Sequence, residues 1–191
     1  MRQSRTLLTL IGLTYAAMLP AQQQQGVRPL RTDIVATYTT ERSLRTSSGQ
    51  SFWKQGGSVN YGTELWKGFG PAADLSVTHT GSIATSGPSL TTLALTFGPR
   101  YRWHPHSKVT PFGEALFGFV HGSNSIFPST AGSSSSATSF SMLVDGGIDF
   151  HVGRHFDLRA PQLGWVHSTL PNGADNVQNN FRLSFGAGVR F

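Results

Sequence analysis

Apolar and polar residues alternate with a period of two along most of the chain. The clearest case is the last segment, where Phe181, Leu183, Phe185, Ala187, Val189 and Phe191 alternate with Arg182, Ser184, Gly186, Gly188 and Arg190. This period places apolar side chains on one face of an extended strand and polar side chains on the other. The pattern recurs, without a helical period, at residues 33–42, 51–65, 71–80, 89–103, 108–120, 139–152, 156–166 and 180–191. The sequence therefore predicts an all-β chain of eight strands.

The connections between these segments alternate in length. Residues 66–70, 104–107 and 153–155 form short connections, whereas 43–50, 81–88, 121–138 and 167–179 are longer, and 129–139 is a Ser-rich loop. The segments are long for soluble strands but long enough to cross a bilayer at a tilt. Short turns on one side and long loops on the other are typical of outer-membrane barrels, whose short turns lie in the periplasm. We predict an eight-stranded antiparallel up-and-down transmembrane β-barrel with both termini periplasmic.

The polar face of these strands is expected to line the lumen. It carries many of the glycines, and the narrow interior of an eight-stranded barrel accepts only modest side chains. It also carries Glu41 and Lys54, together with a predicted lumen charge network of Glu64, Asp74, Arg100, Arg102, Glu114, Asp145, Asp149, Arg159, Arg182 and Arg190. Since buried ions must pair, we expect cross-strand ion pairs that plug the lumen. Phe112, Leu116 and Leu143 fall on the same face by parity, and Pro161 predicts a bulge that puts Trp165 out of phase.

Aromatic residues gather near the ends of the strands, as expected for side chains at the two interfaces of a membrane. Trp66, Phe69, Tyr101, Trp103, Phe150, Phe156 and Phe191 mark the predicted periplasmic side, and Tyr38, Phe52, Trp53, Phe119, Phe140, Trp165 and Phe181 the other. An alternative is a soluble, lipocalin-like ligand carrier of the periplasm, whose apolar face would line a cavity.

The N-terminus has the features of a secretory signal peptide. Arg2 and Arg5 precede an apolar stretch that ends before Ala21, which is too short for a transmembrane helix. We therefore expect a signal peptide at 1–21, a polar lead-in at 22–32 and an outer-membrane barrel at 33–191. Cysteine is absent from the sequence, so disulfides do not stabilise the exported chain.

The C-terminal strand carries a resemblance to known proteins. Phe191, preceded by the outward Val189 and Phe185, resembles the signal read by the outer-membrane barrel assembly machinery. The segments 61–68, 97–101 and 146–149 resemble strands and turns of the outer-membrane β-barrel domain family, which includes small barrels similar to the transmembrane domain of outer-membrane protein A. The resemblance covers residues 30–191 and implies location in the outer membrane of a Gram-negative-type bacterium.

An enzymatic alternative rests on His121-Gly122-Ser123-Asn124. It resembles the His-x-Ser-Asn segment of the lipid A 3-O-deacylase family, another eight-stranded barrel. A His base beside a Ser nucleophile needs a third group that orients the His, and residues 125–138 contain no acid. We therefore favour a strand end over a catalytic site.

Other chemistry has little support in the sequence. His104 and His106 lie on one predicted turn and His151 and His155 on another, so no metal site is expected. Arg42, Arg45 and Lys54 near the outer rim are candidates for contact with lipid A phosphates. Basic residues are dispersed among acids, which argues against nucleic acid binding.

We therefore predict a small closed barrel with a structural or surface-interaction role and a plugged lumen. The expected partners are outer-membrane lipids, lipopolysaccharide and, during biogenesis, the assembly machinery. We expect a monomer without enzymatic activity or cofactor, whose outer loops, above all 121–138, make surface contacts. A lipid-modifying enzyme and the soluble ligand carrier remain alternatives.

Overall fold

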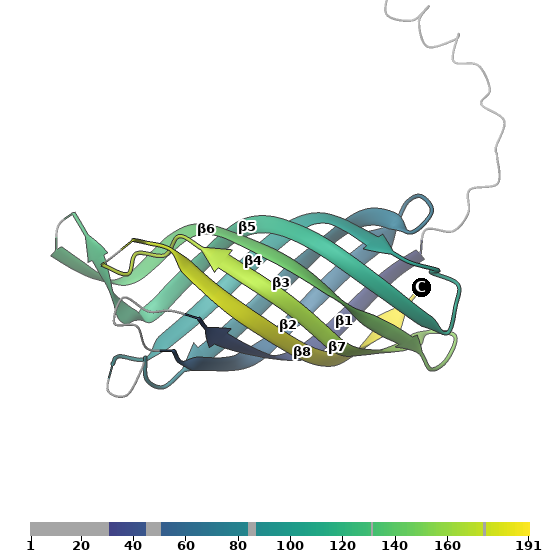
Figure 1. Ribbon diagram of the computed structural model, residues 1–191, viewed down its shortest axis with the longest axis horizontal. Helices are drawn as coiled ribbons and strands as arrows, with labels where there is room; N and C mark the ends of the chain where they lie inside the picture. The colour runs from purple at the N-terminus through teal and green to yellow at the C-terminus, as the bar shows by residue number, and fades with distance from the viewer. Residues whose placement is uncertain (1–30, 45–50, 84–86, 131, 174) are drawn as a thin grey trace, which may run out of the picture.

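The chain folds as eight antiparallel strands that close into one barrel in sequential order, as predicted (Figure 1). The computed structural model describes residues 31–44, 51–83, 87–130, 132–173 and 175–191. The strands are β1 (Arg31–Ser43), β2 (Trp53–Glu64), β3 (Phe69–Thr80), β4 (Leu90–Arg102), β5 (Val109–Ser129), β6 (Gly132–His151), β7 (Phe156–Ser168) and β8 (Gln178–Arg190). The predicted signal peptide lies outside the described residues, and β1 begins within the last two residues of the predicted lead-in.

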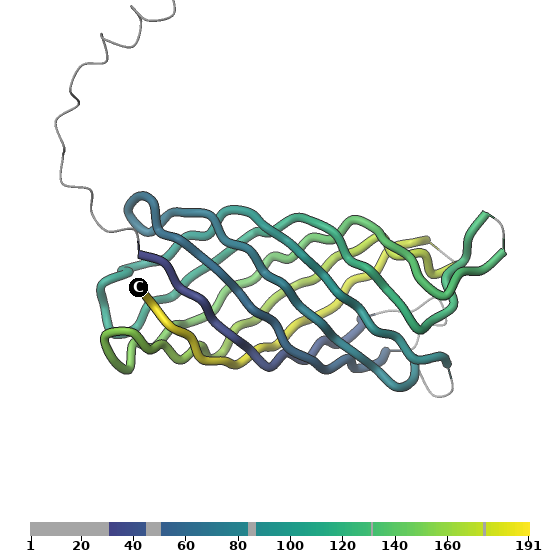
Figure 2. The backbone as a smooth tube through the Cα atoms, turned by 180° about the vertical axis from the view of Figure 1, so that it is seen from behind, coloured from purple at the N-terminus to yellow at the C-terminus, as the bar shows by residue number. Residues whose placement is uncertain are grey.

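The first and last strands close the barrel. β1 pairs with β8 from Asp33 opposite Arg190 to Ser43 opposite Asn180, and Figure 2 shows the two strands side by side. Closure gives the backbone donors and acceptors of every strand partners on both sides, which a bilayer demands because lipid offers none. We call the end where β1 begins and β8 ends the terminal end, and the opposite end the loop end.

Side chains alternate between the lumen and the outer surface. Ile34, Leu95 and Phe185 face outward with exposed fractions of 40%, 55% and 46%, whereas Thr39 and Arg182 are buried. Phe112, Leu116 and Leu143 face inward as predicted, and Leu116 and Leu143 pack with Ala72. The lumen is therefore filled by a mixture of ions, hydroxyl groups and a few apolar side chains.

The predicted irregularity in the seventh strand is present. The pairing of β7 with β8 shifts register between Arg159 and Gln162, around Pro161, which has no N–H to give to a ladder. The shift reverses the phase, so that Arg159 and Gln162 both face the lumen and Trp165 faces outward. A bulge of this kind re-aims the side chains that follow it.

The prediction that residues 121–138 form a loop is wrong. These residues extend β5 and β6 into a hairpin that projects beyond the other strands at the loop end (Figure 1). The strands pair from Ser123 opposite Ser136 to Ser129 opposite Gly132, with a register shift between Ser123 and Phe127. The backbone N–H and C=O groups of these Ser-rich segments pair in this ladder. The register shift interrupts the alternation of buried and exposed residues, so the sequence pattern does not indicate a strand. Described residues include no helix long and apolar enough to span a membrane.

Candidate functional site

Six ionised side chains form a cluster in the terminal half of the lumen. We call it the central ion cluster, and its members are Asp33, Arg100, Arg102, Glu114, Asp149 and Arg159. They come from β1, β4, β5, β6 and β7, so the cluster spans the barrel. Three carboxylates balance three guanidinium groups, which is the arrangement a buried set of ions requires.

Asp33 is the centre of this cluster. Its Oδ2 lies 2.7 Å from Arg102 Nη2, 3.1 Å from Arg100 Nη1 and 3.7 Å from Arg159 Nη2. Alternation in β1 places Asp33 on the face of Thr37, Thr39 and Glu41, but its place in the network was not predicted. One carboxylate therefore contacts three cations, which come from two strands.

The remaining acids of the cluster, Glu114 and Asp149, pair with the arginines that contact Asp33. Arg100 Nε donates to Glu114 Oε2 at 2.7 Å, and Arg159 Nε donates to Asp149 Oδ1 at the same distance. Asp149 also lies 3.4 Å from Arg102. All these residues are at least 95% buried, so water does not screen the interactions.

Two neutral side chains complete the cluster. Asn60 on β2 donates to Glu114 Oε1 at 2.9 Å and accepts hydrogen bonds from Arg159 and Arg100. The ring of Phe112 lies 4.1 Å from the guanidinium carbon of Arg159 and 5.5 Å from that of Arg100. This ring adds a cation–π contact to the hydrogen bonds that both arginines make.

Two more ion pairs lie toward the loop end. Arg182 on β8 reaches across the lumen to Asp74 on β3, with Nη1 3.0 Å from Oδ1. Lys54 Nζ lies 2.7 Å from Glu41 Oε2 between the neighbouring strands β2 and β1. Lys54 is therefore buried and paired, and its assignment to the outer rim as a contact for lipid phosphates is wrong. Arg42 is exposed and lies over Trp53, while Arg45 lies outside the described residues.

A smaller network closes the terminal end. Asp157 Oδ1 accepts from Arg190 Nη1 at 2.7 Å and contacts His151 Nδ1 at 2.6 Å. Arg190 Nη2 also donates to the carbonyl oxygens of Gly153 and Arg154, both at 3.1 Å, so it fixes the β6–β7 turn. Glu64 accepts from the backbone N–H of Gly68 and thus holds the β2–β3 turn. It forms no ion pair with the residues that the structure describes, so the ion pair predicted for it is wrong.

Asp145, like Glu64, departs from the predicted network of ion pairs. Its Oδ2 accepts from Gln162 Nε2 at 2.7 Å, and its Oδ1 has no hydrogen-bond partner among the described residues. No Lys or Arg described here lies within ion-pair distance of it. The cross-strand ion pair expected for Asp145 is thus replaced by an amide contact.

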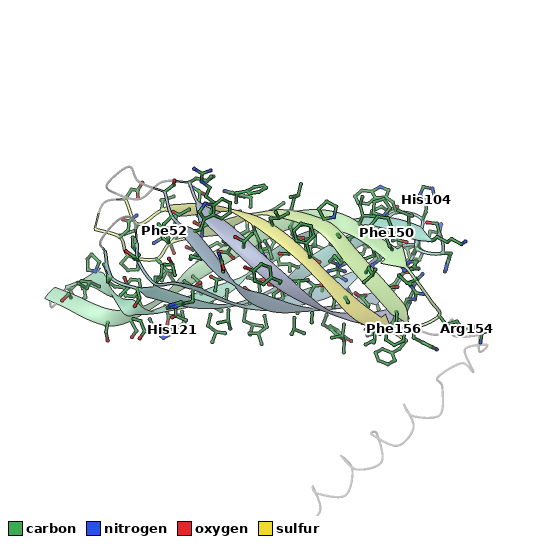
Figure 3. The ribbon with its side chains drawn as sticks, turned by 90° about the horizontal axis from the view of Figure 1, so that it is seen from below. Phe52, His104, His121, Phe150, Arg154 and Phe156 are labelled. Atoms are coloured by element: carbon green, nitrogen blue, oxygen red, sulfur yellow. The ribbon has the colours of Figure 1, made fainter. Side chains whose placement is uncertain are left out.

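An apolar cluster lies inside the barrel at the loop end. It consists of Leu90, Val120, Phe127 and Leu170, with Phe52 and Ile83 packed against them. Phe52 was predicted to lie in the outer aromatic belt, and that prediction is wrong because its side chain packs against this inner cluster. Figure 3 shows Phe52 near the loop end. Between the cluster and the Arg182–Asp74 pair, the lumen keeps a cavity of about 20 Å³, roughly the space of one water molecule.

The β7–β8 loop supplies Leu170 to this cluster and is held by its own hydrogen bonds. Asn172 Nδ2 donates to Asp175 Oδ1 at 3.0 Å, and Val177 N–H donates to the same oxygen at 3.0 Å. These donors hold the pKa of the exposed Asp175 carboxyl below its usual value. The loop is therefore held both by these hydrogen bonds and by the packing of Leu170 in the apolar cluster.

His121, the candidate base of the enzymatic alternative, lies near the loop end (Figure 3). His121 is exposed on the outer face of β5, where its Nδ1 contacts Thr138 Oγ1 at 2.8 Å, and Asn124 donates to Thr91. Among the described residues, no carboxylate contacts His121 and no hydrogen bond joins it to Ser123. His121 Nδ1 therefore contacts a threonine hydroxyl on β6 where a catalytic His would contact an orienting carboxylate.

The histidines of the short turns do not come together as a metal site. His104 and His106 lie on the β4–β5 turn and His155 on the β6–β7 turn, while His151 contacts Asp157. No group of three or more His, Cys, Asp or Glu suited to a metal ion occurs in the part of the chain that the structure describes.

The outer surface is an apolar band between the two ends. Large exposed side chains on all eight strands form it, including most of the aromatic residues expected in the two belts. A family model for the outer membrane protein beta-barrel domain matches residues 11–191. The chain belongs to this family. Its apolar band is accordingly the face that such barrels turn to lipid.

Solved structures of several bacterial proteins share this fold. Ail, the attachment invasion locus protein of Yersinia pestis, is 21% identical, with 84% of this chain and 98% of Ail covered and a TM-score of 0.58. Neisserial surface protein A is 19% identical, with 85% and 97% covered and a TM-score of 0.60. OprG of Pseudomonas aeruginosa is 10% identical, with 84% and 95% covered and a TM-score of 0.50. No curated protein matches the sequence.

The predicted charge network lacked Asp33, Asn60 and Gln162. Asp33 opens the strand predicted at 33–42, where few preceding residues fix the phase of alternation. Asn60 and Gln162 are uncharged, so a search for paired charges passes over them. Their parity along β2 and, after the bulge, along β7 is the feature that identifies them.

Proposed function

We propose that this protein is a closed outer-membrane barrel that does not conduct ions and acts through its surface. The observation that carries the proposal is the central ion cluster, which five strands fill with compensated charges. An apolar cluster occupies the lumen toward the loop end. Ions crossing the barrel would have to break several buried pairs and then pass an apolar constriction.

We further propose that the loop end faces the outside of a Gram-negative-type cell and that the β5–β6 hairpin is its contact surface. The hairpin projects beyond the other strands and exposes Ser, Thr and Pro side chains along 128–138. Ail and neisserial surface protein A, which have the same fold, are by name an attachment protein and a surface protein. A surface role of this chain is the simplest function consistent with a filled lumen.

Planar bilayer recording tests the closed lumen. The folded wild-type barrel should give no steady current. A double variant that removes the central carboxylate and one arginine that it contacts, Asp33→Ala with Arg100→Ala, should show channel openings that the wild-type protein lacks. Exposed Arg42→Ala is the control and should remain silent. Steady currents that are open most of the time in the wild-type protein would overturn the proposal.

Incubation of the folded protein with lipid A tests the enzymatic alternative. The proposal predicts unchanged acylation by mass spectrometry, because the described residues provide His121 with no orienting carboxylate. Loss of an acyl chain that His121→Ala prevents would replace the surface role by catalysis.

A further inference from the structure

An open groove at the terminal end carries an excess of positive charge. It has a volume of about 640 Å³ and lies between the β4–β5 and β6–β7 turns, next to the end of β8. The described residues that line it include Arg31, Lys108, Arg154 and Arg190 but no Asp or Glu. Asp157 and Glu64 lie outside the lining, and both already accept hydrogen bonds.

Only one of these cations is neutralised by a carboxylate side chain. Arg190 pairs with Asp157 and holds the backbone of the β6–β7 turn. Lys108 and Arg154 have no ion pair within the described part of the chain. Arg31 donates through Nη2 to His151 at 3.1 Å, yet its Nε is buried without a partner. Positive charge therefore prevails in the groove.

The turns that carry the free cations are held in place. The carbonyl oxygen of Lys108 accepts from His151 N–H at 2.9 Å, and Val152 N–H donates to Phe156 O at 3.1 Å. Arg190 fixes the carbonyl of Arg154 itself. An anion entering the groove would therefore meet cations on a fixed backbone.

Exposed apolar side chains adjoin this charge. Val152 and Phe191 line the groove with exposed fractions of 67% and 69%. Phe150 and Phe156 are exposed on the outer surface at the same end, where Figure 3 shows Phe156 close to Arg154. A free anion gains nothing from such neighbours, whereas a lipid places acyl chains beside an apolar surface and its phosphate at the height of the headgroups.

We propose that this groove binds the phosphate headgroup of an anionic phospholipid. The phosphate lies among Arg31, Lys108 and Arg154, and the acyl chains run along Val152 and Phe156. The proposal rests on the membrane-spanning barrel but not on the closed lumen or the surface role. It assigns the terminal end a lipid partner, which is separate from any contact made at the loop end.

The test uses the folded full-length barrel in neutral detergent, titrated with phosphatidylglycerol or with phosphatidylcholine of the same chain length and followed by native mass spectrometry. Since a basic residue near a lipid surface contributes about fivefold in affinity, Arg154→Gln should weaken phosphatidylglycerol binding about fivefold. Lys108→Gln with Arg154→Gln should weaken it about 25-fold. Phosphatidylcholine binding should stay unchanged in both variants.

The matched control is Arg42→Gln, which removes one exposed arginine at the loop end and should leave phosphatidylglycerol binding unchanged. All variants must keep the heat-dependent gel shift of the folded barrel, which separates loss of the site from loss of the fold. Equal binding of the two lipids, or an equal loss in Arg42→Gln, would overturn the proposal. Displacement of phosphatidylglycerol by an equimolar amount of inorganic phosphate would overturn the lipid assignment in favour of a free anion.

Discussion

Asp33 receives more ionic contacts than any other acid in the described part of the lumen. Its carboxylate faces Arg100, Arg102 and Arg159, and it is fully buried. Removing one partner of a buried pair leaves an uncompensated charge in a low dielectric, which costs far more than the pair itself contributes. The stability of the cluster therefore depends on this side chain more than on any single arginine.

Asp33→Asn should destabilise the folded barrel by about 3–5 kcal/mol, because it leaves the cluster with three cations and two anions. Equilibrium unfolding in urea from lipid vesicles, followed by tryptophan fluorescence, measures the change. Asp175→Asn makes the same substitution in an exposed loop and should shift the midpoint much less. Equal effects of the two variants would contradict the central place of Asp33.

The Arg182–Asp74 pair allows a second test at this scale. Arg182→Met and Asp74→Leu should each destabilise the barrel by about 3–5 kcal/mol when made alone, since the partner is left buried and unpaired. Made together, they should cost clearly less than the sum, because an apolar pair of similar volume replaces the ions. Strict additivity in the same urea assay would show that the two residues act independently.

Most elements were predictable because the alternation of side chains is continuous within each strand. The bulge at Pro161 was predictable as well, since proline cannot donate to a ladder. The extension of β5 and β6 was not, because Ser-rich segments favour loops and the register shift between Ser123 and Phe127 interrupts the period. Phe52 was misplaced because it was assigned to the belt by its position near a strand end, although it shares the parity of the lumen-facing Lys54.

At the level of one strand pair, Gly118 controls how closely β4 and β5 approach. A Cβ added there would lie 2.0 Å from the carbonyl oxygen of Leu95, so the backbone would have to move. Gly118→Val should therefore lower the free energy of unfolding by about 1–3 kcal/mol, or prevent folding altogether. A Cβ at Gly81 meets nothing within 4 Å, so Gly81→Val should fold normally. The folded fraction on an unboiled gel measures both, and a normal yield of Gly118→Val would contradict the close approach of these two strands.

For the whole molecule, the sequence predicted the barrel and most of the charged residues that face its lumen. It did not predict which of these residues form ion pairs with each other. Asp74 and Arg182 lie on β3 and β8, which are not neighbours, so their contact depends on the stagger of strands around the barrel. Alternation fixes which face a residue occupies but not its height in the lumen. The partners of each charge follow only from the closed structure.

The orientation of the whole barrel can be tested with epitope tags. A tag inserted after Thr130, at the tip of the β5–β6 hairpin, should bind antibody on intact cells. A tag inserted after Gly153, in the β6–β7 turn, should bind only after the outer membrane is permeabilised. The opposite pattern would place the termini outside.

The central claim is that the chain forms a closed barrel in the outer membrane, and gel migration of the membrane-extracted protein tests it most directly. Expressed with its N-terminal segment, the protein should fractionate with the outer membrane and require detergent for release. Its band should migrate differently before and after boiling, because a closed barrel stays compact in unheated detergent. Soluble periplasmic protein without a shift on boiling would contradict the account, since the apolar band would then have to face a ligand rather than lipid.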